Sequence, residues 1–331
     1  MTPGGYAGKY LEVDLTNEKI DEITYSDKIL RQYFGGRGLA AKILWDKVGE
    51  DWPELDPLSP ESPFIVLTGP MTGIYPGSRI CVSGKSPISA GTVGSTAATE
   101  FANEMKQAGY DGITFMGKAE KPVYLMITDD GAELRDASHL WGLDGEKTLI
   151  KLNKEVTDEL KKRKPEVGLW KEPGMIYIGP AGENLVRNSA VLAKICHACG
   201  YGGYGSLMGS KNLKAVVAKG RGSLPKVDAP EAAKLLWKRT HEHLMARSGM
   251  RRQGTGYAGY SVGAETSSEP IRNWQEEWHD EKSYGGPMFE TRFWVKKKWA
   301  DFNCTTNCMK VSCIKSGPWK GDITDMPDYE L

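Results

Sequence analysis

Short apolar segments that end at glycine recur through the first two thirds of the chain. They are "FIVLTGP" (64–70), "MIYIGPAGEN" (175–184) and "KAVVAKG" (214–220). A run of four to eight apolar, β-branched or aromatic residues bounded by glycine or proline is typical of a strand. The opening "KYLEVDLT" (9–16) adds a strand in which Leu11, Val13 and Leu15 alternate toward one face, leaving the other face wet. We therefore expect a fold built on β-sheets.

Turn and helix signals complete this strand-rich part. In "VYLMITDDGAELRD" (123–136), Asp129-Asp130-Gly131 supplies the turn of a hairpin. Apolar residues then recur at helical spacing at Leu149, Leu152, Val156 and Leu160. Pro165 limits the C-terminal end of that helix. Up to about residue 226 the sequence predicts an α+β unit.

The character of the chain changes after "GSLPKVDAP" (222–230). Asp228 and Pro230 form a helix start, and the following "EAAKLLWKRTHEHLMA" is helical. A polar, glycine- and tryptophan-rich passage over 248–286 is expected to be irregular, and "RFWVKKKWADF" (292–302) to be a short helix. We place a boundary at Lys226, which gives domains over 1–226 and 227–331, the second mainly helical.

Charge and hydropathy exclude several classes of protein. Lys and Arg (43) balance Asp and Glu (43), so no net field attracts nucleic acid or an acidic membrane. No run of 18 apolar residues exists, which excludes a transmembrane helix. The first 14 residues lack the basic and then apolar layout of a signal peptide, so we expect a cytoplasmic protein.

Five of the six cysteines fall in two tight clusters, which favours metal ligation over disulfides in a chain of this length. Cys304, Cys308 and Cys313 are spaced C-x3-C-x4-C. Three thiolates on a loop suit a [4Fe–4S] cluster, although zinc or three unrelated buried thiols remain alternatives. Either metal site needs a fourth ligand, which "CTTNCMKVSC" (304–313) and the residues after it do not offer.

The other cluster, Cys196 and Cys199, encloses His197 and precedes several glycines. The pair is compatible with half of a zinc site, a redox dithiol or a turn of small residues. Glycine immediately after Cys199 argues against the dithiol, which usually opens a helix. The pair alone decides nothing.

Several longer segments together carry a family resemblance. They occur in this order: "YFGGRGLAAKIL" (33–44), "PLSPES" (57–62), "LTGPMTG" (67–73), "GKSP" (84–87), "AGYDGI" (108–113), "IGPAGEN" (178–184) and "MGSKNLKA" (208–215). The chain resembles the N-terminal part of the aldehyde ferredoxin oxidoreductase family, the tungsten bis-pterin oxidoreductases. The resemblance is dense up to residue 220 and weaker beyond.

The resemblance implies a base of two β-sheets that holds two pterins around one tungsten, followed by a helical region. It also implies a [4Fe–4S] cluster that passes electrons to ferredoxin, and it allows for a magnesium ion bridging the pterin phosphates. The reaction implied is oxidation of an aldehyde to a carboxylate, or a related low-potential reaction. In relatives the fourth cluster cysteine comes later, so here we expect a partner chain, or Cys81, Cys196 or Cys199, to supply it.

The family's glycine-rich pterin loop, of the form R-A-x-G-R-G-G-x-G, falls on the stretch with the first cysteine pair. The residues implied at this loop are His197, Ala198, Gly200, Tyr201, Gly202 and Gly203. Glycines there let the backbone approach a phosphate-bearing cofactor without obstruction by Cβ. His197 and Tyr201 stand where the family has arginine, and this is a departure.

A second pterin segment and two further positions follow from the same resemblance. Arg79 matches an arginine that bridges pterin and cluster. The Asn-Ser-Gly-Gly segment falls on Thr96, Ala97, Ala98 and Thr99, so its glycines are absent here. The glutamate near tungsten falls on Glu330, and the cluster spacing departs from the common C-x2-C-x3-C.

The resulting hypothesis is an oxidoreductase of the aldehyde ferredoxin oxidoreductase type, acting on an aldehyde or oxo group with an iron–sulfur acceptor. Ferredoxin, and either a second copy or a partner chain, are the expected partners. The alternative is a non-catalytic subunit that binds the cofactor or cluster within a larger redox assembly. The departures at 96–99, His197 and Tyr201 favour the alternative.

Overall fold

The computed structural model describes residues 2–194, 197–246, 251, 254, 275–276, 291, 293–300 and 302–325. The chain divides into two compact units, Met1–Pro230 and Glu231–Leu331. The expected boundary at Lys226 stays a prediction.

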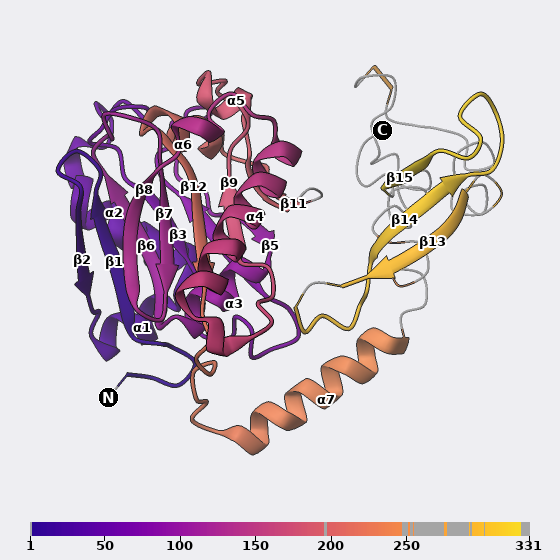
Figure 1. The fold of residues 1–331 in the computed structure, drawn as a ribbon. Coiled ribbons are helices and arrows are strands. Elements are labelled where there is room, and N and C mark those ends of the chain that lie inside the picture. The colour runs from indigo at the N-terminus through magenta and orange to yellow at the C-terminus, as the bar shows by residue number, and fades with distance from the viewer. Residues whose placement is uncertain are drawn as a thin grey trace. The chain divides into compact units, whose positions relative to one another are not determined.

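The first unit is built on two six-stranded mixed sheets (Figure 1). In spatial order the first sheet contains β2 (Lys19–Ile23), β1 (Lys9–Asp14), β6 (Tyr110–Met116), β3 (Phe64–Leu67), β4 (Arg79–Ser83) and β5 (Ser95–Ala98). The second contains β11 (His197–Cys199), β10 (Val191–Lys194), β9 (Gly174–Tyr177), β12 (Leu213–Lys219), β7 (Val123–Thr128) and β8 (Gly131–Asp136). Strands β1 and β6 pair in parallel, as do β12 and β7.

Helices accompany both sheets. They are α1 (Asp27–Tyr33), α2 (Gly36–Val48), α3 (Glu100–Gln107), α4 (Gly145–Arg163), α5 (Pro180–Glu183) and α6 (Tyr204–Ser210), with 3-10 turns at Gly49–Asp51, Ser138–Leu140 and Pro165–Val167. The predicted α+β class, with two β-sheets and helices, is confirmed. The predicted hairpin over 123–136 and the helix ending before Pro165 are also confirmed.

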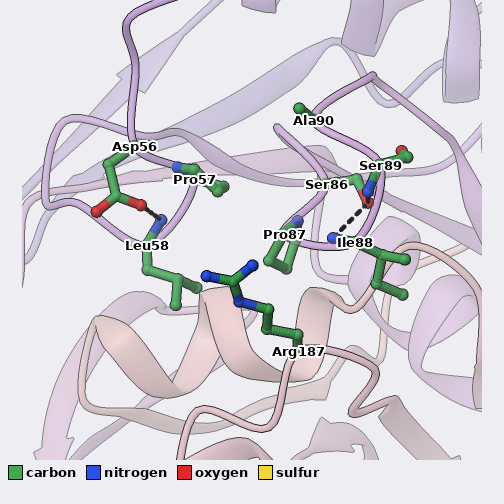
Figure 2. A pocket seen from close by; sticks show the side chains of 9 residues that line it. All are labelled: Asp56, Pro57, Leu58, Ser86, Pro87, Ile88, Ser89, Ala90 and Arg187. Carbon is green, nitrogen blue, oxygen red and sulfur yellow. Dashed lines mark hydrogen bonds between the residues drawn. The ribbon is translucent and has the colours of Figure 1, made fainter.

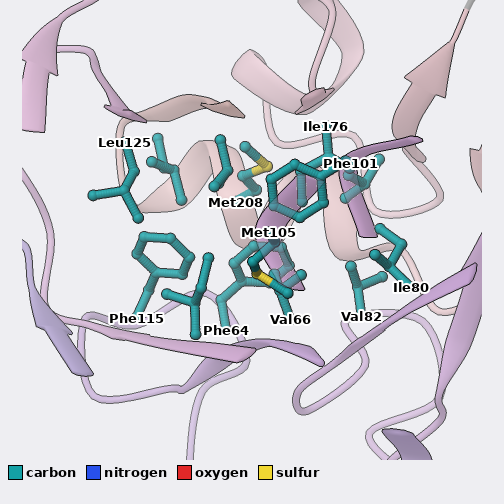
Figure 3. Close-up of a cluster of buried hydrophobic side chains, with 14 of the residues drawn as sticks. Phe64, Val66, Ile80, Val82, Phe101, Met105, Phe115, Leu125, Ile176 and Met208 are labelled. Atoms are coloured by element: carbon teal, nitrogen blue, oxygen red, sulfur yellow. The ribbon is translucent and has the colours of Figure 1, made fainter. Parts of the chain in front are cut away.

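The main core lies between the sheets. Figure 3 shows Phe64 and Val82 of the first sheet facing Leu125 and Ile176 of the second, with α3 between them. Leu11, Val13 and Leu15 belong to this core, as their alternation predicts. The other face of β1 is not wet at Tyr10, which packs in a separate cluster with α1 and α2. Helix α4 covers the outer face of the second sheet in the same way.

Lys211, just after α6, is a buried cation of the first unit, and no carboxylate of the described residues is in contact with it. Its side chain is fully buried, and Nζ donates to the carbonyls of Pro60 at 3.0 Å and Gly117 at 3.1 Å. Burial lowers the pKa of Lys211 from 10.5 to about 8, against a smaller opposing effect of Glu61. The lysine thus holds two loops together while its charge is costly to bury.

This burial predicts a pH-dependent stability. Above pH 8 the folded chain has released the lysine proton, which the unfolded chain keeps up to about pH 10.5, so the free energy of unfolding rises with pH. Between pH 8 and pH 10.5 we expect the free energy of unfolding of wild type to rise by roughly 3 kcal/mol relative to that of Lys211→Met. Urea unfolding of both proteins at several pH values measures the difference. If the free energies of unfolding of the two proteins depend on pH in the same way, the pKa of Lys211 is not lowered by burial.

The described part of the second unit holds one helix and one sheet. Helix α7 (Pro230–Ala246) confirms the predicted helix start at Pro230, whereas the Asp228 carboxylate accepts from the amide of Gly4 at 3.2 Å. Strands β13 (Phe293–Trp299), β14 (Met309–Ile314) and β15 (Ile323–Asp325) form an antiparallel sheet in the order given. The prediction of a short helix over 292–302 is wrong. The segment pairs along its length with β14, from Phe293 with Ile314 to Trp299 with Met309, and its aromatic and β-branched residues suit a strand.

Among the described residues, no helix is both long enough and apolar enough to span a bilayer.

Candidate functional site

The predicted pterin segments come together where edge strand β5 of one sheet meets edge strand β11 of the other. The amide of Tyr201, after β11, donates to Ser95 Oγ at 3.2 Å. Ser86 Oγ donates to the carbonyl of Gly202 at 2.9 Å. The buried Tyr204 hydroxyl donates to the carbonyl of Val93 at 2.6 Å. Two segments about one hundred residues apart in sequence are thus joined at one edge of the unit.

Hairpin pairing places Arg79 beside the second predicted segment. Across β4 and β5, Arg79 pairs with Ala98, Ile80 with Ala97, and Cys81 with Thr96. Arg79 is exposed at the start of β4, and no described residue pairs with its guanidinium. An exposed guanidinium opposite Ala98 is available to a phosphate or a pterin oxygen.

The predicted segment 96–98 contributes less than the resemblance implies. It forms strand β5 rather than a loop, so its backbone is engaged with β4. Ala97 is 3% exposed and belongs to the core between the sheets, whereas Thr96 and Ala98 are half-buried. Only Thr96 and Ala98 can therefore present side chains to a cofactor.

The loop after β11 has two kinds of glycine. Gly203 has φ +74, and a Cβ there would lie 1.9 Å from the carbonyl oxygen of Arg187, so the fold itself requires glycine. Gly200 is exposed, and a Cβ there would meet nothing within 4 Å. The structure alone gives no reason for glycine at 200. Within the described part of the chain nothing obstructs the backbone at this position, which is compatible with the approach of a cofactor.

The remaining loop residues differ in exposure. Tyr201 is 65% exposed, Ala198 is exposed, and His197 is half-buried, whereas Gly202 is buried. His197 and Tyr201, which stand at the family's arginine positions, thus both reach the surface of the loop.

One residue at this edge, Arg37, was not among the predicted site residues. Arg37, from the "GGRGL" segment, donates from Nε to the carbonyl of Gly94 at 2.8 Å and lies close to Cys81. Burial raises the pKa of Cys81 to about 11, which Arg37 opposes. Arg37 thus adds a cation close to Cys81 of β4. The sequence contains one indication of this role, because Arg37 lies in a segment on which the family resemblance rests.

Cys199 lies in the interior beside this edge. It is fully buried, and burial, with a smaller effect of Cys81, raises the pKa of its thiol to about 12, against the opposing charge of Arg79. A thiol with this surrounding is a core residue. To serve as the fourth cluster ligand, Cys199 would have to leave the core. Cys196 lies outside the described residues.

The three cysteines of the second unit have the right chemistry for a cluster but do not converge. Cys304 and Cys308 are half-buried in the loop before β14. Cys313 is buried within β14, and its Sγ lies 3.5 Å from the carbonyl oxygen of Gly321. Across the described parts of the chain, no three His, Cys, Asp or Glu side chains are grouped as a metal ion requires. The three thiols are not grouped as a cluster requires in this structure, and binding of a cluster by them stays a prediction.

The predicted catalytic residue, Glu330, also lies outside the described residues. The part of the site that the structure describes is therefore the edge formed by β4, β5 and the loop after β11.

Comparison with known proteins matches most of the chain. Residues 10–220 match the family described as aldehyde ferredoxin oxidoreductase, N-terminal domain. Residues 231–331 match aldehyde ferredoxin oxidoreductase, domains 2 and 3.

Individual relatives agree with this match. The aliphatic sulfonate oxidoreductase, WOR-like subunit, of Pyrococcus furiosus is 52% identical over 98% of this chain and 52% of its own length. A tungsten-containing aldehyde ferredoxin oxidoreductase of the same organism is 32% identical over 98% of this chain and 51% of its own length. The chain therefore spans about half the length of these relatives.

A solved structure has the same fold. It is the active site complex BamBC of benzoyl coenzyme A reductase in complex with 1,5-dienoyl-CoA. The match has a TM-score of 0.72 and 27% identity, and covers 97% of this chain and 49% of the other.

Proposed function

The chain belongs to the aldehyde ferredoxin oxidoreductase family, and on that premise we propose that it is the pterin-binding part of a tungsten oxidoreductase. The observation that carries the proposal is that strand β5 contacts both predicted elements: Arg79 pairs with Ala98 at one of its ends, and the loop over 200–203 bonds to Ser95 at the other. A tungsten bis-pterin group, when bound, supplies two-electron redox chemistry at low potential. The protein contributes position, charge and exclusion of water.

Named residues would hold the group as follows. The Arg79 guanidinium presents a planar set of donors to phosphate or pterin oxygens, and Arg37 adds positive charge close to Cys81 of β4. The open face of Gly200 admits the cofactor to the backbone. Ser95 and Ser86 fix the loop through the amide of Tyr201 and the carbonyl of Gly202. A loop held in this way needs no rearrangement on binding.

The substrate belongs to the proposal as well. One relative is named for aliphatic sulfonates and another for aldehydes. We favour small aldehydes or aliphatic sulfonates as substrates, with electrons accepted by ferredoxin or another iron–sulfur protein in the cytoplasm. A partner chain or second copy completes the assembly.

The alternative of a non-catalytic subunit has an observation in its favour. The segment 96–98 lacks the family's glycines and pairs as strand β5, and Ala97 packs in the core. A cofactor that relies on this segment would be held weakly. The two functions differ in whether tungsten and pterin are retained.

Composition of the anaerobically purified protein tests the proposal. We expect tungsten together with pterin, and iron at about four per chain with sulfide, as a [4Fe–4S] cluster requires. Tungsten and pterin are measured by mass spectrometry and by pterin fluorescence after oxidation. Iron and sulfide without tungsten would support the non-catalytic alternative, and zinc without sulfide would reject the cluster.

Arg79→Lys is the sharper form of this test. The lysine keeps the charge but loses the planar fork, so we expect less pterin per folded chain. Stability should change by less than about 1 kcal/mol, because Arg79 is exposed and unpaired among the described residues. Arg31→Lys, at an exposed arginine of α1, is the matched control. Normal pterin content in an unstable Arg79→Lys protein would make this arginine structural.

A further inference from the structure

A cavity of about 340 Å³ lies beside the glycine loop (Figure 2). Its wall is largely apolar, with Pro57 and Leu58 on one side and Pro87 and Ile88 on another. Figure 2 shows the guanidinium of Arg187 pointing between Leu58 and Pro87 toward the middle of the cavity. A cavity of this size suits a small organic molecule.

Arg187 has no counter-charge within the described part of the chain. Its guanidinium forms no ion pair or hydrogen bond with another described residue. Asp56, the carboxylate at the rim, instead accepts from the amide of Leu58 at 2.9 Å through Oδ1. An arginine aimed into a cavity without a partner leaves its fork of donors free for an oxyanion.

The opposite wall is rigid. Ser86 Oγ accepts from the amides of Ile88 and Ser89, each at 3.2 Å, while donating to Gly202. Ala90, in the same turn, has φ +56, a left-handed conformation that a non-glycine residue adopts at a cost. The cavity is therefore held open by a fixed turn.

Two residues that line the cavity, Ser86 and Arg187, also contact the glycine loop. The carbonyl of Arg187 lies against Gly203, and Ser86 bonds to Gly202. The cavity nevertheless contains none of the predicted pterin-contacting residues. It is therefore a second site next to the first.

We infer that this cavity binds a small molecule with an oxyanion group, a carboxylate, phosphate or sulfonate, which pairs with Arg187 while its apolar part contacts Leu58, Pro87 and Ile88. The oxyanion has two sources, a free organic anion or a phosphate of the bound cofactor. The inference stands apart from the proposed redox function, because it depends on Arg187 and the cavity and not on electron transfer.

Binding of simple probes tests it. Propionate, methanesulfonate and inorganic phosphate are titrated calorimetrically into the full chain, with and without its cofactor. We expect saturable binding of at least one probe. Arg187→Gln should weaken that binding about tenfold or more, since it removes a charge-assisted pair. Arg187→Lys should have an intermediate effect, and Asp56→Asn should leave binding equal or tighter.

The outcomes separate the two sources. Binding to both forms of the protein indicates a free organic anion, whereas binding only to the cofactor-free form indicates that a cofactor phosphate fills the site. Arg31→Gln is the control and should bind as wild type does. Absence of saturable binding to either form, or equal affinity of Arg187→Gln and wild type, overturns the inference. If Arg187→Gln fails to fold, Arg187→Lys carries the comparison.

Discussion

Replacing Glu104 by Ala is expected to lower the free energy of unfolding of the first unit by about 3–5 kcal/mol. Glu104, on α3, accepts from Lys219 Nζ at 2.8 Å and from the amide of Gly220 at 3.1 Å. The two side chains are only 11% and 7% exposed. Truncating Glu104 leaves the Lys219 charge buried with a weak contact to the carbonyl of Glu172 at 3.4 Å. An unpaired buried charge is among the costliest single defects.

The pair itself is not a large source of stability. Burial raises the pKa of Glu104 above 4.5, despite the opposing effect of Lys219. The folded chain therefore binds this proton more tightly than the unfolded chain, and ionisation costs stability as the pH rises through that range. The double variant Glu104→Leu/Lys219→Met should consequently lie much closer to wild type than Glu104→Ala does.

Hydrogen exchange of peptides from α3 and β12 measures this effect, because it reports the opening of the first unit separately from the second. Glu54→Ala, at an exposed glutamate, serves as the control and should change stability by less than about 0.5 kcal/mol. If the double variant is destabilised by the sum of its single changes, the two residues do not act as a pair.

The glycine loop yields the second large effect. Gly203→Ala is expected to destabilise the first unit by roughly 3 kcal/mol or more, through the left-handed φ of +74 and the 1.9 Å contact with the Arg187 carbonyl. Gly200→Ala has neither problem, so its stability should stay within about 0.5 kcal/mol of wild type. Both are measured by the same exchange experiment.

For cofactor content we expect the larger effect at Gly200, the glycine whose replacement leaves stability unchanged. If a pterin lies against the backbone at 200, Gly200→Ala lowers pterin per folded chain although the fold is intact. Pterin fluorescence after oxidation gives the content. Unchanged pterin in Gly200→Ala would remove this position from the cofactor site and leave Gly203 as a purely structural glycine.

The sequence predicted local structure where one physical rule applied without competition. Alternation placed Leu11, Val13 and Leu15 in the core, and helical spacing with Pro165 bounded α4. The resemblance predicted the family and the two sheets, because the glycines and arginines of the matching segments can be recognised in the sequence without a structure. The segment at 293–299 was misread, because pairing with β14, rather than its own pattern, makes it a strand.

The sequence alone predicted helices α4 and α7, the family, and six strands of the two sheets, namely β1, β3, β7, β8, β9 and β12. Each of these depends on residues that are near one another in the chain or on a pattern shared with relatives. The tertiary structure decided which predicted residues can act together. It alone brought Ser95 to Tyr201, buried Ala97 and Cys199, and aimed Arg187 into a cavity. Contacts between segments one hundred residues apart are set by how two sheets pack, and no local pattern encodes that packing.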